Sequence, residues 1–289
     1  MKNGSKTTVL KRLFLVAGYN PNGIIDEALA YYVRQLKRFG DVILCMDSDI
    51  DDSELEKVQK YCLHVMAKRH GEYDFGSYKR AYKWACDNLT LRDYTCLYLV
   101  NDSVYGPVFD MGEILGKLES TGTHASGIVI SKHRTHSFLE SWFVKLTKKI
   151  FLSEWFAKFL DSVTQEPTKN QVTLKYEHGL TNLILENECT ARGVYLVHGR
   201  HTYNYPKSLV LHGCPFFKKV CFTRHCGALG AQVKYILDHT NVITRTAIMD
   251  SVNRLYGAEY VKNFLTSNPF KILGRKIKYA KQKIKDARQ

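Results

Sequence analysis

The chain has 289 residues, of which 45% are hydrophobic and 12% aromatic, so it can bury a sizeable core and is not a disordered protein. Its formal net charge is +14, and much of that charge lies near the carboxyl end. No apolar stretch approaches the ~20 residues that a membrane-spanning helix needs, and no signal-peptide pattern opens the sequence, so we expect a cytoplasmic protein that does not cross a bilayer.

Strands and helices alternate in the first half of the chain. Apolar runs predict strands at residues 13–17, 41–46, 62–67, 95–100 and 126–130, and amphipathic patterns predict helices at residues 25–39 and 76–88. Turn-forming residues separate these segments. Alternation of this kind is typical of an α/β protein with a Rossmann-type, mostly parallel sheet that helices cover on both faces.

The second half is less regular. The dense aromatic and aliphatic pattern of residues 137–160 predicts two consecutive helices, shorter segments follow to residue 222, and the remainder is helical. We therefore expect one domain over residues 1–222, with a first part at about 9–130 and a second at about 131–222. A helical C-terminal region over residues 223–289 completes the chain.

The end of the chain predicts a basic amphipathic helix over residues 269–289. Eight basic residues stand there against one acid. Apolar residues recur at spacings of three and four: Phe270, Leu273, Ile277, Ala280, Ile284 and Ala287. An apolar stripe opposite a cationic face favours an anionic membrane surface as partner, with packing onto the protein or a second copy as the alternative. Nucleic acid is not expected, because stacking aromatics are not interleaved with the basic residues.

The eight cysteines are scattered through apolar segments without a Cys-x-x-Cys pair, so we expect reduced and mostly buried thiols. A zinc site is the alternative. Its ligands would be Cys214, Cys221, His225 and Cys226.

A first polar cluster spans residues 68–80, between a predicted strand and a predicted helix. Asp74 could accept hydrogen bonds from ligand hydroxyls, and Gly71 and Gly76 permit close approach of the backbone. The cations of this cluster suit a diphosphate: Lys68, Arg69, Lys79 and Arg80. The alternative is that Asp74 caps the helix and that the basic side chains are solvated.

A second polar cluster, Asn101-Asp102-Ser103, follows the strand at residues 95–100. Polar groups at the carboxyl end of a strand are placed to meet a ligand. Asp102 is therefore a candidate ligand for Mg²⁺ or Mn²⁺ bridging a diphosphate, although one carboxylate holds a divalent cation more weakly than two. The literal Asp-x-Asp at Asp47-Ser48-Asp49 we interpret as a loop with helix-capping residues.

Four segments stand in a specific order, at residues 69–80, 101–107, 137–143 and 176–181. This order resembles the rhamnan synthesis protein F family of bacterial polysaccharide glycosyltransferases, from about residue 13 to about 219. One departure is Glu140, where the family often has glutamine. The resemblance implies a GT-A-like fold, a nucleotide-sugar donor such as dTDP-rhamnose, and a cell-surface polysaccharide or lipid-linked glycan as acceptor. It also implies a peripheral location at the inner face of the bacterial membrane.

On this resemblance we expect a glycosyltransferase, and a non-catalytic glycan- or nucleotide-sugar-binding module of the same fold is the alternative. A hydrolase is disfavoured because the chain has no Walker-type loop. Glu177 is the expected base for the acceptor hydroxyl, with His178 as a lesser candidate. The alternative for Glu177 is a carboxylate at a helix N-terminus, favoured by the helix dipole.

The remaining expected site residues bind the donor. They are Tyr19, Asn20, Arg69, Asp74, Phe75, Gly76, Ser77, Lys79, Asn101, Asp102, Ser103, His212 and Lys218. Tyr19 and Asn20 would contact the nucleotide base or else form a structural turn. His212 would approach the diphosphate or else be an ordinary loop histidine, and Lys218 or Lys219 would neutralise charge on the leaving group.

Overall fold

The computed structural model describes residues 10–133, 136–224 and 228–286. Within these residues the largest element is a sheet of eight strands. They are β1 (Arg12–Gly18), β2 (Asp41–Met46), β3 (His64–Ala67), β4 (Cys96–Asn101), β6 (Ala125–Lys132), β7 (Ser137–Leu139), β8 (Phe143–Thr147) and β9 (Ala191–His198).

The strands lie in the order β3-β2-β1-β4-β8-β6, and β6 also pairs with β7 and β9. The four strands β1 to β4 are parallel, whereas β8 is antiparallel to both β4 and β6. The sheet is therefore mixed but mostly parallel, and helices flank it. The fold class expected from the sequence is confirmed.

Alternate side chains of each strand point to opposite faces of the sheet and bury two apolar layers. In β1, Phe14 and Val16 join the layer under α1 (Glu27–Lys37), α2 (Asp52–Gln59) and α4 (Gly112–Glu119). Leu13 and Leu15 join the opposite layer. That layer is covered by α3 (Tyr73–Asn88), α5 (Lys148–Phe151), α6 (Glu154–Asp161), α7 (Lys169–Val172), a π-helical turn (Thr173–His178) and α8 (Gly179–Glu186).

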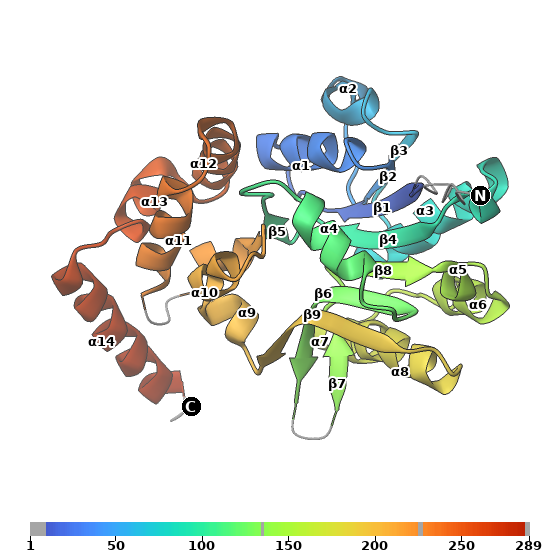
Figure 1. Ribbon diagram of the computed structural model, residues 1–289. Coiled ribbons are helices and arrows are strands. Elements are labelled where there is room, and N and C mark those ends of the chain that lie inside the picture. The colour runs from blue at the N-terminus through green and yellow to red at the C-terminus, as the bar shows by residue number, and fades with distance from the viewer. Residues whose placement is uncertain (1–9, 134–135, 225–227, 287–289) are drawn as a thin grey trace, which may run out of the picture.

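The C-terminal helices lie beyond the carboxyl ends of the parallel strands (Figure 1). Between β9 and these helices the chain forms α9 (His201–Asn204), α10 (Pro206–Leu211), β10 (Phe217–Lys218) and a 3₁₀ turn (Lys219–Phe222). The helices α11 (Leu229–Asp238), α12 (Val242–Tyr256) and α13 (Ala258–Phe264) bury a third apolar cluster.

This third cluster reaches back into the sheet region. It includes Tyr105 of β5 (Val104–Tyr105), which pairs with β10, and Phe217 and Phe222 from the chain just before residue 223. The Tyr105 hydroxyl lies 3.2 Å from Ser251 Oγ, and Ser251 donates to Asp26 Oδ2 at 2.8 Å. The start of α1 is therefore tied to α12, and the division of the chain near residue 222 stays a prediction.

The predicted terminal helix is present as α14 (Pro269–Asp286), which extends away from the other helices (Figure 1). Arg275 attaches it by donating to the main-chain oxygens of Phe264 and Asn263. Phe270, Leu273 and Ile277 remain 82%, 55% and 49% exposed. In the described part of the chain, none of the helices is both long and apolar enough to span a bilayer.

One prediction of secondary structure was wrong. Residues 137–147 form β7 and β8 instead of a helix, and the helices α5 and α6 begin only at Lys148. A dense run of apolar residues fits a buried helix or a buried strand equally well from its pattern alone. Because β8 pairs with both β4 and β6, it lies between two strands of the sheet, and these pairs fix it as a strand.

The central strands carry the stability of the fold. Leu99 of β4 is fully buried, so Leu99→Ala should lower the free energy of unfolding by about 2–5 kcal/mol in urea titrations. Leu185 of α8 is 53% exposed, and Leu185→Ala should change it by less than about 0.5 kcal/mol. Equal losses in the two variants would contradict this placement of the core.

Candidate active site

The topology singles out one edge of the sheet. The strands β2 and β3 lie on one side of β1, and β4 lies on the other. In open α/β sheets the chains that leave two such strands diverge, and ligands bind in the crevice that forms at the carboxyl ends of these strands. Tyr19 and Asn20 follow β1, and Asp102 and Ser103 follow β4.

Asn101 organises the turn after β4. Its Oδ1 accepts hydrogen bonds from the Ser103 main-chain N–H at 3.1 Å and from Ser103 Oγ at 2.6 Å. Its Nδ2 donates to Asp74 Oδ2 at 2.8 Å, and the Asp102 N–H donates to the Ala17 carbonyl at 3.0 Å. One amide side chain thus joins the end of β4 to the first turn of α3.

Asp74 is half-buried among other charged groups. Burial raises the pKa of its carboxyl from 3.8 to about 6, helped by the charges of Asp102 and Glu177 and opposed by Lys169 and Lys218. The residue that precedes α3 is Glu72 rather than Asp74. The alternative in which Asp74 caps the helix is therefore wrong, and its carboxylate accepts from Asn101 instead.

Glu177 lies in the π-helical turn between α7 and α8. Its Oε1 accepts from the Ser141 N–H at 2.7 Å and from Ser141 Oγ at 2.9 Å. Burial raises the pKa of Glu177, and the two hydrogen bonds from Ser141 moderate the effect. Because a helical stretch begins at Lys169, well before Glu177, the alternative of a helix N-terminal carboxylate is wrong.

Two consecutive lysines of the β10 region face the turn after β4. Lys219 Nζ pairs with Asp102 Oδ2 at 3.2 Å, and the Lys219 N–H donates to the Ser103 carbonyl at 2.9 Å. Lys218 Nζ donates to Ser103 Oγ at 3.1 Å and lies 5.0 Å from the centre of the Trp142 ring. The two ammonium groups therefore flank the Asn101-Asp102-Ser103 turn.

The surroundings of the two lysines shift their pKa values in opposite directions. Burial lowers the pKa of Lys218, while the carboxylates of Glu140 and Glu177 act in the opposite direction. Burial alone would also lower the pKa of Lys219, but Asp102 and Asp26 raise it above its ordinary value. Lys219 is thus firmly charged, whereas the ammonium group of Lys218 bears a cost of burial that nearby carboxylates partly offset.

The loop between β3 and α3 is fastened by Asp47. Its Oδ1 accepts from the main-chain N–H groups of His70 at 2.7 Å and Gly71 at 2.8 Å. Helix α2 is preceded by Asp51, so the expected helix-capping role of Asp47-Ser48-Asp49 is wrong, although the segment is a loop as predicted. This fastening places Arg69 beside Tyr19.

Three of the expected donor-binding residues meet at this loop. The Arg69 guanidinium lies 4.9 Å from the centre of the Tyr19 ring, which is 48% exposed. Asn20 is buried, and Ser48 Oγ both accepts from its N–H and donates to its carbonyl at 2.9 Å. An exposed aromatic ring beside an exposed arginine is a surface that a nucleotide base can stack on.

Three other expected residues, Phe75, Gly76 and Ser77, lie in the first turns of α3 and are buried. Phe75 packs among Tyr78 and Tyr176 in the core, and Ser77 Oγ lies 3.1 Å from His70 Nε2. A Cβ on Gly76 would collide with Glu72 and, at 2.8 Å, with the His70 ring. These residues support the loop that carries Arg69.

Three further expected residues, Lys79, His178 and His212, also lie away from the cluster at the ends of β1 and β4. Lys79 donates to the carbonyls of Asp161 and Val163, at 3.1 and 2.9 Å, near the end of α6. The His178 ring stacks on Phe138 of β7 with 3.8 Å between centres. His212 ends α10, and its Nδ1 lies 2.7 Å from the Ser208 carbonyl.

Some residues of the cluster were not expected. Ser141 lies inside the third motif of the sequence and was not assigned a role, but it holds Glu177 in place. Asp26 caps α1 through Leu29 and also faces Lys219. No short pattern identifies Asp26, because its partners come from distant parts of the chain.

The residues around Asp102 do not fit a divalent cation. The Asp102 carboxylate already pairs with Lys219, and a second ammonium, that of Lys218, lies beside Ser103. Within the described residues there is also no group of three His, Cys, Asp or Glu side chains that could hold a metal ion. Of the expected zinc ligands, Cys214 and Cys221 are buried, and His225 and Cys226 lie outside the described residues.

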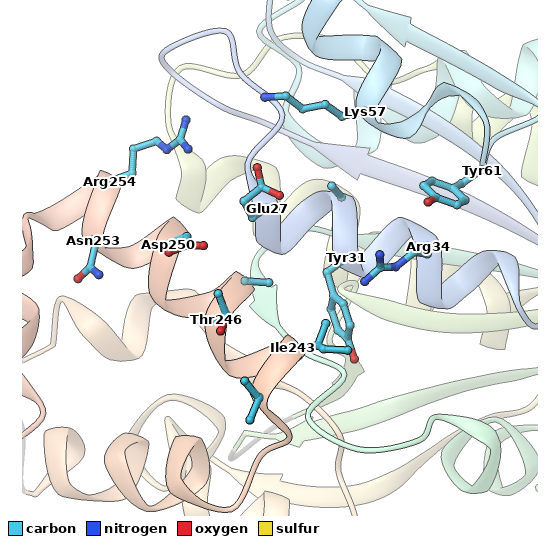
Figure 2. Close-up of a pocket in the computed structure, with 13 residues that line it drawn as sticks. Glu27, Tyr31, Arg34, Lys57, Tyr61, Ile243, Thr246, Asp250, Asn253 and Arg254 are labelled. Carbon is cyan, nitrogen blue, oxygen red and sulfur yellow. The ribbon is translucent and has the colours of Figure 1, made fainter.

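A separate open cavity of about 870 Å³ lies between α1 and α12. Figure 2 shows Tyr31 and Arg34 of α1 on one side and Asp250, Asn253 and Arg254 of α12 on the other. Its lining includes none of the expected site residues. The candidate site is instead the polar cluster at the ends of β1 and β4, the place to which the sheet topology points.

Fold and site define a class: an α/β protein with a polar cluster of side chains at the switch point of a mostly parallel sheet. The sequence matches the rhamnan synthesis protein F family over residues 42–284, which is most of the chain. The protein belongs to this family. None of the curated proteins compared with it matches its sequence.

Several solved structures are distantly similar. A Desulfovibrio desulfuricans G20 protein assigned as a nucleotide-diphospho-sugar transferase has 14% identity and a TM-score of 0.41, over 86% of this chain and 98% of its own. The glycosyltransferase GlyE of Streptococcus pneumoniae TIGR4 has 15% identity and a TM-score of 0.37, over 71% and 50% of the two chains. Core-mannan synthase A of Aspergillus fumigatus, in an Mn/GDP form, has 10% identity and a TM-score of 0.32, over 55% and 65%.

The raised pKa of Asp74 predicts a pH dependence of stability. Between its ordinary value of 3.8 and about 6, the folded protein keeps the Asp74 proton that the unfolded chain releases. The contribution of Asp74 to stability is therefore complete below pH 3.8 and is lost as the pH rises through 6.

Comparison with Asp74→Asn isolates this contribution. Between pH 4 and pH 7 the wild-type protein should lose on the order of 1–2 kcal/mol of unfolding free energy relative to the variant. Urea titrations at several pH values measure the difference. A difference that does not change with pH would contradict the raised pKa.

Proposed function

We propose that the protein is a glycosyltransferase that moves a sugar from a nucleotide-diphosphate donor to a hydroxyl group of an acceptor glycan. The observation that carries the proposal is the cluster of charged residues at the switch point of the sheet, in a member of the rhamnan synthesis protein F family. There the charges of Asp102, Glu177 and Lys218 all act on the Asp74 carboxyl. The charges of Asp74 and Glu177 in turn act on the Lys218 ammonium. Carboxylates to bind hydroxyls and take a proton, next to a cation for phosphate, are what this transfer requires.

We assign the donor to the ends of β1 and β4. The nucleotide base stacks near Tyr19 and Arg69, and the main chain around Asn20 borders the ribose. The diphosphate lies toward Lys218. Asp74, held by Asn101, and the Asp102-Ser103 turn accept or donate hydrogen bonds to the sugar. Support for this order comes from the positions of the residues along one edge of the sheet.

Glu177 is the proposed base. As the acceptor oxygen bonds to the anomeric carbon, its proton passes to the Glu177 carboxylate, and the bond from that carbon to the phosphate oxygen breaks. The electron pair leaves with the nucleoside diphosphate. The raised pKa makes Glu177 a stronger base than an ordinary carboxylate, and π-helical turns such as the one that carries it are frequent at functional sites.

The chemistry of donor and acceptor follows the family. We propose a deoxyhexose donor such as dTDP-rhamnose and a growing bacterial cell-surface polysaccharide, such as an O-antigen or capsule, or a lipid-linked glycan as acceptor. A polysaccharide of this kind is extended at the inner face of the membrane. The exposed stripe of α14 supports a peripheral location there.

Glu177→Gln tests the catalytic assignment. Gln retains an oxygen that can accept from Ser141 but cannot take a proton, so turnover should fall by at least about 10²-fold. The dissociation constant of the donor, measured by calorimetry, should stay within about threefold of wild type. The donor panel is dTDP-rhamnose, UDP-glucose and GDP-mannose.

Glu186→Gln provides the matched control. Glu186 lies on the same helical stretch but is exposed, so its replacement should leave turnover unchanged. Full turnover by Glu177→Gln would remove Glu177 from the role of base. Donor binding without turnover in the wild-type protein would favour a non-catalytic binding module.

The membrane assignment rests on α14. Its exposed apolar residues Phe270, Leu273 and Ile277 lie on a helix that also exposes Lys271 and Lys276. Such a helix inserts its apolar side at the headgroup boundary, while its cations meet anionic lipid.

Vesicle sedimentation measures this binding. Truncation after Asn268, or the triple change of Phe270, Leu273 and Ile277 to serine, should weaken binding to phosphatidylserine-containing vesicles at least about tenfold, and added salt should weaken wild-type binding. The control changes Val242 and Ile243 of α12 to serine, since these are 65% and 64% exposed. Equal loss in the control, or none on truncation, would refute the role of α14.

A further inference from the structure

We propose that Lys218 takes the place of a divalent metal ion at the diphosphate of the donor, so that sugar transfer by this protein does not depend on Mg²⁺ or Mn²⁺. The inference rests on the proposed function and deepens it. It replaces the expectation from the sequence that Asp102 binds a metal.

The first observation concerns Asp102. A divalent cation at this place would need the Asp102 carboxylate as a ligand, but Lys219 already neutralises it at 3.2 Å. The pair is largely shielded from solvent, since the two side chains are 18% and 14% exposed. The main chain reinforces it, because the Lys219 N–H also binds the Ser103 carbonyl at 2.9 Å. A metal ion bound to Asp102 would lie beside the Lys219 ammonium, and the repulsion between the two cations disfavours it.

The second observation concerns Lys218. Lys218 is 7% exposed, so more than nine-tenths of this residue is buried. The hydrogen-bond partner of its Nζ is a hydroxyl, Ser103 Oγ at 3.1 Å, and the rings of Trp142 and Tyr203 lie 5.0 and 5.8 Å away. The charges of Glu140, Glu177 and Asp74 act on Lys218 without forming a direct ion pair. A buried ammonium without a directly bonded carboxylate is costly, and an arriving phosphate oxygen would relieve that cost.

The third observation is the geometry that joins the two lysines. Phe217 and Lys218 of β10 pair with Tyr105 and Val104 of β5, directly after the Asn101-Asp102-Ser103 turn. The turn is thereby held between two ammonium groups before any ligand is present. A preorganised cation of this kind stabilises charge on a leaving group without reorganisation during the reaction.

The balance of the transfer step is unchanged by this assignment. The acceptor oxygen bonds to the anomeric carbon and gives its proton to Glu177, the bond to the phosphate oxygen breaks, and its electron pair stays on the nucleoside diphosphate. The Lys218 ammonium pairs with that terminal phosphate. It keeps its own protons.

The experiment measures binding of dTDP, UDP and GDP, and of the matching nucleotide sugars, to the full chain by calorimetry. Each titration is run with EDTA and again with Mn²⁺ in excess. We expect a nucleotide that binds the wild-type protein to do so within about twofold in the two conditions. Turnover of the bound donor should likewise persist in EDTA.

Variants at position 218 assign this binding to one side chain. Lys218→Met removes the charge but keeps the length, and it should weaken nucleotide binding at least tenfold, with no rescue by Mn²⁺. Lys218→Arg keeps the charge and should retain most of the affinity. Thermal unfolding of each variant verifies folding, which Met should preserve because it relieves a buried charge.

Lys158→Met is the matched control, because Lys158 lies on α6, is 72% exposed and pairs with the exposed Glu154. It should bind nucleotide as the wild type does.

Loss of binding or turnover in EDTA, restored by Mn²⁺, would overturn the inference and leave the proposed function standing. Unchanged affinity in Lys218→Met would overturn it as well. If none of the nucleotides or nucleotide sugars binds the wild-type protein, the inference and the proposed function both fail.

Discussion

The pairing of β5 with β10 is the constraint on which the candidate site depends. It joins segments whose paired side chains, Asp102 and Lys219, are 117 positions apart in the sequence. Without it the turn after β4 would present a lone carboxylate to solvent. With it, the same turn lies between two lysines, and the C-terminal helices pack against the strand that follows the turn. The cluster at the switch point is therefore built jointly by the sheet and by the region that follows it.

The groups of the site differ in how strongly the structure favours their charged forms. Lys219 and Asp102 neutralise each other, whereas Asp74 and Glu177 have raised pKa values because burial disfavours their charged forms. Such a division suits chemistry in which one group stays fixed while another exchanges a proton. The hydrogen bonds from Ser141 and Asn101 hold the two exchangeable carboxyls in place.

Local pattern was sufficient for the parallel part of the sheet. The strand predicted at residues 41–46 coincides with β2, and the turn after β4 was correctly expected to carry polar side chains because strand ends are visible as abrupt changes from apolar to polar residues. Residues 137–147 were mistaken for a helix because partners on both sides, β4 and β6, decide their conformation. Pairs such as Glu177 with Ser141, or Lys219 with Asp102, depend on tertiary contacts that no window of sequence contains.

Asp26 interacts with three separate parts of the molecule. Its Oδ1 caps α1 through the Leu29 N–H, its Oδ2 accepts from Ser251 of α12, and its charge acts on Lys219. One small side chain thus serves as a mechanical junction between the sheet, the helical region and the charged cluster. The position of α12 on α1 and the charge on the ammonium beside Asp102 are therefore coupled through a single carboxylate.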